Sequence, residues 1–183
     1  FAMESATYHT AALIDSGCED YMLETAMLKV FASDALWRIV NDTLQIWGGA
    51  GYFSDQPFER MMRDARINLI GEGANDVLRS FIAMVGLRNV GMELESLKRK
   101  PWTVAKLWRS TPRVPVIPAT SARLSTRAQL QTAAGDLGRQ IGRFGRVCRN
   151  VLVKYRENIL ERQYVQARLA DTATELFISG CVY

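Results

Sequence analysis

The chain has 183 residues, of which 48% are hydrophobic and 23% are charged, a balance typical of soluble globular proteins. No apolar run approaches the roughly 20 residues that a transmembrane helix needs. The net charge of +4 conceals an asymmetry, because residues 1–97 carry seven basic and fourteen acidic residues whereas residues 98–149 carry twelve basic residues and one acidic residue.

Both ends of the chain look like cut ends. Residues 1–6 show no targeting pattern and already have the composition of a helix interior. Residues 176–183 stop while the sequence is still apolar. We therefore expect an internal piece of a longer protein.

Cysteine and histidine are scarce and widely spaced. Cys18, Cys148 and Cys181 lack the spacing of metal ligands, which indicates free thiols in a reducing compartment. The single histidine, His9, cannot form a zinc site alone, and we expect it at a structural or exposed position on a helix. No metal site is expected.

The first half of the chain is predicted to be helical throughout. Apolar residues recur at helical spacing in four segments: 3–14, 21–45, a short piece around 61–62, and a helix that begins near Asn75 or Asp76 and continues to Leu87. The glycine cluster at 48–51 is expected to end the second segment, because glycine suits helix C-caps and tight turns.

A proline-containing stretch separates this half from the rest. Four prolines between residues 101 and 118 mark a basic linker over residues 98–123. Beyond it, apolar periodicity predicts helices over roughly 124–157 and 159–180. No segment reads as a strand, so the predicted fold class is all-α, with a helical bundle over 1–97 and a helical extension over 124–183.

Two glycine clusters, at 48–51 and around Glu72, allow two interpretations. Glycines serve as helix caps and turns, and Glu72 alone reads as an acid favoured at the first turn of a helix. Alternatively, glycines let the backbone approach a ligand closely beside a helix N-terminus. The residues by themselves leave both interpretations open.

Other conspicuous residues between the clusters have structural interpretations. The run Arg63-Asp64-x-Arg66 is expected to form ion pairs on a helix surface. Four large side chains are expected to be packing residues: Trp37, Trp47, Met61 and Met62.

Three motifs in order carry a resemblance to a known family. They are Gln45-x-x-Gly48-Gly49-x-Gly51-Tyr52, then Glu59-Arg60-x-x-Arg63-Asp64-x-Arg66, then Glu72-Gly73-x-Asn75-Asp76-x-Leu78-Arg79. Together they resemble the C-terminal helical domain of acyl-CoA dehydrogenases over residues 1–95. Residues 98–183 resemble the C-terminal extension of the very-long-chain branch, which includes a mitochondrial paralogue that also serves in complex I assembly.

The resemblance assigns roles to individual residues. Glu72 aligns with the catalytic base, and Gly71 and Gly73 flank the acyl thioester. The segment that contacts the ADP part of FAD in the neighbouring subunit comprises Gln45, Ile46, Trp47, Gly48 and Gly49. A second segment that touches FAD comprises Ala74, Asn75 and Asp76.

The resemblance also implies a reaction and its partners. A carboxylate in a dry pocket removes the α-proton of a fatty acyl-CoA, its own amide helps to polarise the thioester carbonyl, and the β-hydrogen leaves as hydride to the flavin. The product is the trans-2-enoyl-CoA of fatty acid β-oxidation, with long or very long chains preferred. We expect a homodimer that binds FAD across its subunits, an electron-transfer flavoprotein as acceptor, and a location in the bacterial cytoplasm or at the mitochondrial matrix and inner membrane. This piece alone is expected to be inactive.

Two positions depart from the family pattern. The family usually has an aromatic residue at the position of Gly71 and a threonine at that of Ala74. These departures keep two alternatives open: an acyl-CoA- and FAD-binding or assembly protein with little turnover, and an acyl-CoA oxidase.

The basic linker is the remaining feature. Residues 98–109 interleave Trp102 and Trp108 with five lysines and arginines, a pattern that suits the interface of an anionic membrane. The alternative is a solvated linker. No nucleic acid is expected as a partner, because no binding motif accompanies the charge. We therefore expect a peripheral membrane contact through residues 98–123.

Overall fold

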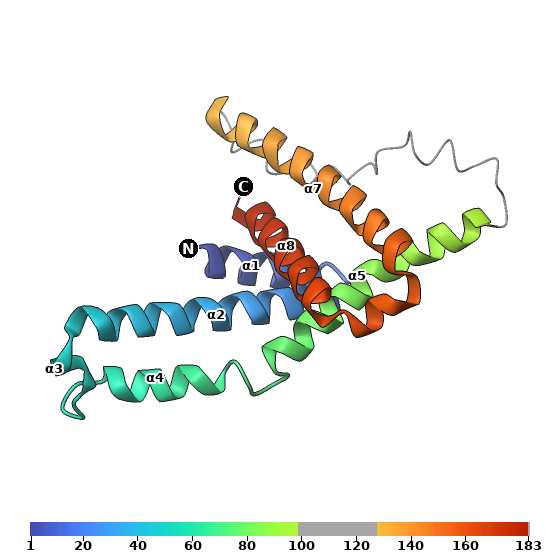
Figure 1. The fold of residues 1–183 in the computed structure, drawn as a ribbon. Coiled ribbons are helices and arrows are strands. Elements are labelled where there is room, and N and C mark those ends of the chain that lie inside the picture. The colour runs from blue at the N-terminus through green and yellow to red at the C-terminus, as the bar shows by residue number, and fades with distance from the viewer. Residues whose placement is uncertain (99–127, 183) are drawn as a thin grey trace.

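The computed structural model describes residues 1–98 and 128–182, in which every regular element is a helix. The all-α prediction is therefore confirmed for these residues. In chain order the elements are α1 (Ala2–Asp15), α2 (Met22–Trp47), α3 (Gly49–Tyr52), α4 (Phe58–Ile67), α5 (Asn75–Lys98), α7 (Ala128–Tyr155), the 3₁₀ helix η2 (Arg156–Glu161) and α8 (Gln163–Val182) (Figure 1).

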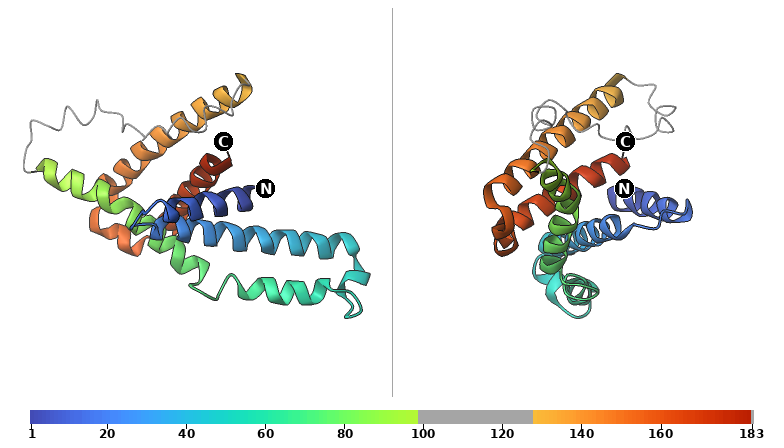
Figure 2. Two further views of the ribbon diagram at one scale, coloured as in Figure 1. Left: turned by 180° about the vertical axis from the view of Figure 1, so that it is seen from behind. Right: turned by 90° about the vertical axis from the view of Figure 1, so that its right-hand side faces the viewer.

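Helices α2 and α4 lie side by side and α3 forms the tip between them, as Figure 1 and the left view of Figure 2 show. Helix α2 ends as predicted at the glycine cluster, where Gly48 has φ +60° and donates its N–H to the Gln45 carbonyl at 3.1 Å. Gly51 is buried, and a Cβ there would lie 2.9 Å from the Cβ of Trp47. The tip therefore requires glycine at position 51, because nothing larger fits.

The core lies where α2, α5, α7 and α8 meet. Its buried members come from both halves of the sequence, and they are Ala26, Met27, Val30, Ile82, Ala83, Leu87, Cys148, Ile159, Leu169 and Ala170. Helix α8 packs against α1, α2, α5 and α7. The predicted extension thus shares one core with the predicted bundle, and its division from the bundle at residue 98 stays a prediction.

Helix α7 ends slightly earlier than the periodicity predicted. The chain changes direction at Arg156, which has φ +48°, and continues as η2. The buried Gln166 side chain stabilises this corner by donating to the carbonyls of Ile159 and Leu160 at 2.6 and 3.0 Å. The sequence around Arg156 contains no glycine or proline that would predict this change of direction.

Some predictions fall outside the described residues. The linker from residue 99 to 123, with its predicted membrane contact, and the predicted start of the next helix at 124–127 are among them. Among the described helices, none combines the length and the apolar character that a membrane span requires.

The three cysteines are free thiols, as predicted. Burial raises the pKa of the Cys148 and Cys181 thiols to about 11, so both stay protonated at neutral pH. His9 is exposed on α1, with its ring edge toward Phe177 at 6.3 Å between centroids. That position agrees with the predicted exposed or structural role.

Candidate active site

Glu72 lies in the loop between α4 and α5, with its backbone in the left-handed region. Its φ is +55° and that of Gly73 is +93°. A non-glycine residue in this region costs roughly 1–2 kcal/mol, so it persists only where neighbouring contacts hold it. Glu72 is exposed in this chain. The predicted dry pocket is therefore not formed by the described residues alone.

Backbone hydrogen bonds close the loop at both of its ends. The Gly71 N–H donates to the Ile67 carbonyl at 2.7 Å, and the Asn75 N–H donates to the Leu69 carbonyl at 3.0 Å. The first bond continues α4 by a turn, and the second closes the loop at the start of α5. Glu72 is thereby presented at the N-terminal end of a 24-residue helix.

Lys29 of α2 contacts this loop from the side. Its ammonium donates to the Gly73 carbonyl at 2.6 Å and to Asn75 Oδ1 at 2.7 Å. Burial lowers the pKa of the Lys29 ammonium below its ordinary value, and the carboxylates of Asp34 and Glu72 partly offset that shift. The site therefore contains a cation close enough to Glu72 for the two charges to interact.

The Asn75 side chain is buried and its hydrogen bonds are all directed to α2. Its amide nitrogen donates to Ser33 Oγ at 2.9 Å and to Asp34 Oδ1 at 2.8 Å, while its oxygen accepts from Lys29. Both amide hydrogens are thus used inside the protein. Because the backbone N–H of Asn75 is bonded to the Leu69 carbonyl as well, all of its N–H donors are used within the chain.

Arg79 extends the network to α8. Its guanidinium donates to Asp34 Oδ2 at 2.5 Å and to Asp171 Oδ1 at 2.7 Å. Burial by itself lowers the pKa of the guanidinium, but the hydrogen bonds to Asp171 and Asp34 outweigh burial, so this pKa lies above its ordinary value. Arg79 lies on α5, so its bonds to Asp34 and Asp171 link α5 to α2 and to α8.

The predicted ADP-contacting segment is exposed at the other end of α2. Residues 45–49 are all exposed, and a Cβ placed on Gly48 or Gly49 would meet nothing within 4 Å. Trp47, predicted as a packing residue, is 50% exposed and stacks on Phe58 at 4.8 Å between ring centroids. This segment offers open backbone and an aromatic surface.

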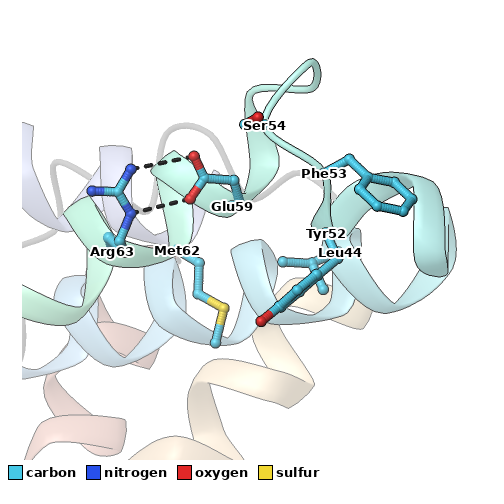
Figure 3. Close-up of a pocket in the computed structure, with 7 residues that line it drawn as sticks. All are labelled: Leu44, Tyr52, Phe53, Ser54, Glu59, Met62 and Arg63. Carbon is cyan, nitrogen blue, oxygen red and sulfur yellow. Dashed lines mark hydrogen bonds and ion pairs between the residues drawn. The ribbon is translucent and has the colours of Figure 1, made fainter.

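A hollow of about 500 Å³ lies beside the tip, between α2, α3 and α4 (Figure 3). Its lining comprises Leu44, Tyr52, Phe53, Ser54, Glu59, Met62 and Arg63. Arg63 donates to both carboxylate oxygens of Glu59, at 3.1 and 3.2 Å.

The predicted ion pairs on α4 are confirmed for Arg63 and Asp64 but not for Arg66. Besides the Arg63–Glu59 pair, Arg60 lies 3.6 Å from Asp64, and both pairs have (i, i+4) spacing. Arg66 instead lies over the ring of Trp37 at 6.0 Å. Met62 and Trp37 are partly buried as expected of packing residues, whereas the prediction for Met61 is wrong, because its side chain is 46% exposed.

The structure does not bring the two predicted cofactor segments together. Lys29 contacts the Glu72 loop, and Gln45 lies 16 residues further along the same helix (45 minus 29). At 1.5 Å per residue, this separation corresponds to about 24 Å along the helix axis. Figure 1 shows the α3 tip and the start of α5 well apart.

Comparisons with known proteins identify the family. The family model for the acyl-CoA dehydrogenase C-terminal domain matches residues 2–87, and the model for the ACAD9/ACADV C-terminal domain matches residues 128–183. The chain belongs to the acyl-CoA dehydrogenase family. The predicted resemblance is confirmed in both parts of the sequence.

Individual relatives are similar over different lengths. The chain is 31% identical to the mitochondrial very long-chain specific acyl-CoA dehydrogenase of Bos taurus, over 97% of this chain and 28% of that protein. It is 46% identical to the cyclohexane-1-carbonyl-CoA dehydrogenase of Geobacter metallireducens, over 45% of this chain and 21% of that protein. The chain thus spans less than a third of the relatives that it matches.

A solved structure shares the fold. An acyl-CoA dehydrogenase of Bacillus anthracis, crystallised in complex with FAD, superposes with a TM-score of 0.72 at 23% sequence identity. The match covers 99% of this chain and 32% of that one. The arrangement of helices described above is therefore that of an acyl-CoA dehydrogenase, the additional helices included.

Sequence reasoning missed the network behind the loop. Lys29, Ser33 and Asp34 lie on a helix whose apolar spacing drew attention to its packing face. A possible signal was the spacing of Lys29 and Ser33, which lie one helical turn apart. Asp171, 92 residues from Arg79, gave no signal of its own.

Proposed function

We propose that this chain is the base-carrying helical part of an FAD-dependent acyl-CoA dehydrogenase. The reaction is the α,β-dehydrogenation of long or very long fatty acyl-CoA thioesters to trans-2-enoyl-CoA, a step of fatty acid β-oxidation. The observation that carries the proposal is Glu72, an exposed carboxylate in left-handed backbone between two glycines. Backbone strain of this kind gathers at functional sites.

Each residue of the loop has a separate role in the proposed reaction. The Glu72 carboxylate accepts the α-proton of the thioester, and its own N–H donates to the thioester carbonyl, where negative charge develops. Gly71 and Gly73 carry no side chain that would keep the thioester away from the backbone. The Lys29 ammonium fixes the loop by donating to the Gly73 carbonyl and to the Asn75 side chain.

The described residues fit a large dinucleotide cofactor at two places. The exposed segment from Gln45 to Gly49 would hold the ADP part of FAD, where open glycine backbone and the face of Trp47 are accessible. The segment of Ala74, Asn75 and Asp76 would contact FAD beside the base. FAD, when bound, supplies the acceptor for the β-hydride.

The separation of these two segments supports a homodimer. A single chain holds them about 24 Å apart along α2, so one chain offers the base to one FAD and its ADP-contacting segment to another. Mixed dimers test this. A dimer of one Glu72→Gln chain and one Gly49→Trp chain retains one site with both parts intact, whereas either homodimer retains none. Mixing the two inactive variants should restore activity, and the absence of any restored activity would refute the shared site.

Further partners follow from the family. An electron-transfer flavoprotein would reoxidise the flavin, and the enzyme would reside in the bacterial cytoplasm or at the mitochondrial matrix and inner membrane. The basic segment at 98–123 would bind an anionic membrane surface. Flotation with cardiolipin vesicles tests that contact, and a variant with Trp102→Ser and Trp108→Ser should float less than the wild type.

The central experiment replaces the base in the complete protein. Glu72→Gln should retain FAD and bind acyl-CoA, but reduce the flavin at least about a hundredfold more slowly, a typical loss for a general base. The measurement is anaerobic bleaching of flavin absorbance by acyl-CoA. Glu157→Gln, at an exposed position of η2, is the matched control and should bleach at the wild-type rate.

The same measurement separates the alternatives. A wild-type protein that binds FAD and acyl-CoA without bleaching would be a binding or assembly protein, the alternative favoured by Gly71 and Ala74. Rapid reoxidation of the bleached flavin by oxygen would identify an acyl-CoA oxidase. Near-normal bleaching by Glu72→Gln would overturn the assignment of the base.

A further inference from the structure

The loop that carries Glu72 needs an external support. Glu72 and Gly73 both have positive φ, and the backbone hydrogen bonds that close the loop lie at its ends, on Gly71 and Asn75. With both ends of the loop fixed, the Glu72 side chain can change direction only through a concerted change of the torsions of residues 72–74, which also turns the Gly73 carbonyl. A group that holds the Gly73 carbonyl therefore restricts the direction of the carboxylate.

Lys29 is placed to do this. Its ammonium is bonded to the Gly73 carbonyl at 2.6 Å and to Asn75 Oδ1 at 2.7 Å, one contact on each side of Ala74. Both bonds are charge-assisted, and such bonds are shorter and stronger than neutral ones. Asn75 is itself anchored to Ser33 and Asp34, so the support rests on the rigid helix α2.

We propose that Lys29 is a positioning residue for the proton-abstraction step, because it holds the Gly73 carbonyl and so aims the Glu72 carboxylate at the substrate. This inference rests on the proposed role of Glu72 as the base. Lys29 itself touches neither the substrate nor the reacting atoms. Its loss misplaces the carboxylate, and a misplacement of about 1 Å can cost about a hundredfold in rate.

The test compares substitutions at Lys29 in the complete, flavin-loaded protein. Lys29→Met keeps the length of the stem but removes the donors. It should slow anaerobic flavin reduction about ten- to a hundredfold, while the affinity for a non-reactive acyl-CoA thioether changes less than about threefold. Lys29→Arg retains a positive charge and hydrogen-bond donors, but its planar guanidinium differs in shape from an ammonium. Its rate of flavin reduction should therefore lie between those of Lys29→Met and the wild type.

A second readout does not depend on the flavin. Hydrogen exchange of the peptide that covers residues 69–76 should become faster in Lys29→Met, because the loop has lost its external hydrogen bond. Lys154→Met, at an exposed lysine of α7, is the matched control and should change neither exchange nor rate. Should Lys29→Met fail to retain FAD, Lys29→Gln replaces it with the same expectations.

Gln166→Ala distinguishes positioning from a general loss of stability. It removes the buried hydrogen bonds to the carbonyls of Ile159 and Leu160 but none of the bonds around the Glu72 loop, so it should lower the unfolding temperature and preserve the rate. Wild-type flavin reduction in Lys29→Met, or a rate loss in Gln166→Ala as large as in Lys29→Met, would overturn the inference. If Glu72→Gln keeps the wild-type rate, the proposed base fails. If Glu72→Gln is inactive and Lys29→Met is not, only the role of Lys29 fails.

Discussion

The two carboxylates that accept hydrogen bonds from Arg79 should contribute very differently to stability, whereas the fully exposed Asp76 lies 3.9 Å away. Arg79 donates to Asp34 and to Asp171 over similar distances, 2.5 and 2.7 Å. Their surroundings differ, because the Asp34 side chain is 21% exposed and that of Asp171 is 53% exposed. Asp34 also accepts a hydrogen bond from the buried Asn75 amide. The perturbation we consider is replacement of each aspartate by alanine.

The expected loss of folding stability in each variant depends on how exposed the replaced aspartate is. Asp34→Ala leaves one arm of a mostly buried guanidinium and one amide hydrogen without a carboxylate. Breaking a fully buried pair costs 3–5 kcal/mol, and the residual exposure here lowers the expected cost to about 3 kcal/mol. Asp171→Ala breaks a half-exposed ion pair, for which water replaces the lost partner, and should cost about 1 kcal/mol.

Urea unfolding of the chain, followed by far-UV circular dichroism, measures both values. With a urea dependence of about 2 kcal/mol per molar, the expected midpoint shifts are about 1.5 M for Asp34→Ala and about 0.5 M for Asp171→Ala. Asp42→Ala is the matched control, because it places alanine at an exposed position of α2 and gains the same helix propensity. The urea midpoints of Asp34→Ala and Asp171→Ala should be compared with the midpoint of Asp42→Ala.

The double variant provides the sharper test. Because Asp34 and Asp171 share one guanidinium, their losses should not add, and the double variant should lose about 1 kcal/mol more than the sum of the singles. Equal shifts for the two single variants would refute the argument from exposure. Strict additivity would show that Arg79 does not link α2 to α8 in solution.

Three further substitutions near Glu72 have expected outcomes. Gly73→Ala should destabilise the chain by about 1–2 kcal/mol in urea unfolding, because φ is +93° and the new Cβ would lie 3.3 Å from Leu78. Ala74→Ser should stabilise it by about 1 kcal/mol, since position 74 precedes α5 and alanine cannot cap it. Gly71→Tyr should fold normally, as its Cβ would meet only the Ile67 carbonyl at 3.4 Å, and should alter chain-length preference in acyl-CoA kinetics of the complete protein.

Helices were predictable from the sequence because their signals are local. Apolar spacing and the glycines at 48–51 placed α2 within two residues at its C-terminal end (Gln45 expected, Trp47 observed). The start of α5 was expected near Asn75 or Asp76 and lies at Asn75. The corner at Arg156 was not predictable, because no glycine or proline marks it.

The candidate site was predictable only in part. The motifs located Glu72 and its glycines, which are neighbours in sequence. Lys29 and Gly73 are 44 residues apart and Arg79 and Asp171 are 92 apart, so their pairing depends on how α2, α5 and α8 pack. Packing of this kind is set by the whole core, and no local pattern encodes which polar residues will face one another across it.

The exposure of Glu72 implies that the described residues provide only part of what the proposed chemistry requires. A carboxylate surrounded by water is a poor base for a thioester α-proton, and general-base catalysis of that step needs a drier environment. Apolar side chains flank the loop but remain open to solvent, with Ile67, Ile70 and Val77 between 53% and 65% exposed. They can line a dry pocket only when another segment covers them. In the proposed reaction, this chain would supply the geometry of the base, through the left-handed backbone of Glu72 and the contacts of Lys29, and the desolvation that makes the base reactive would come from outside the described residues.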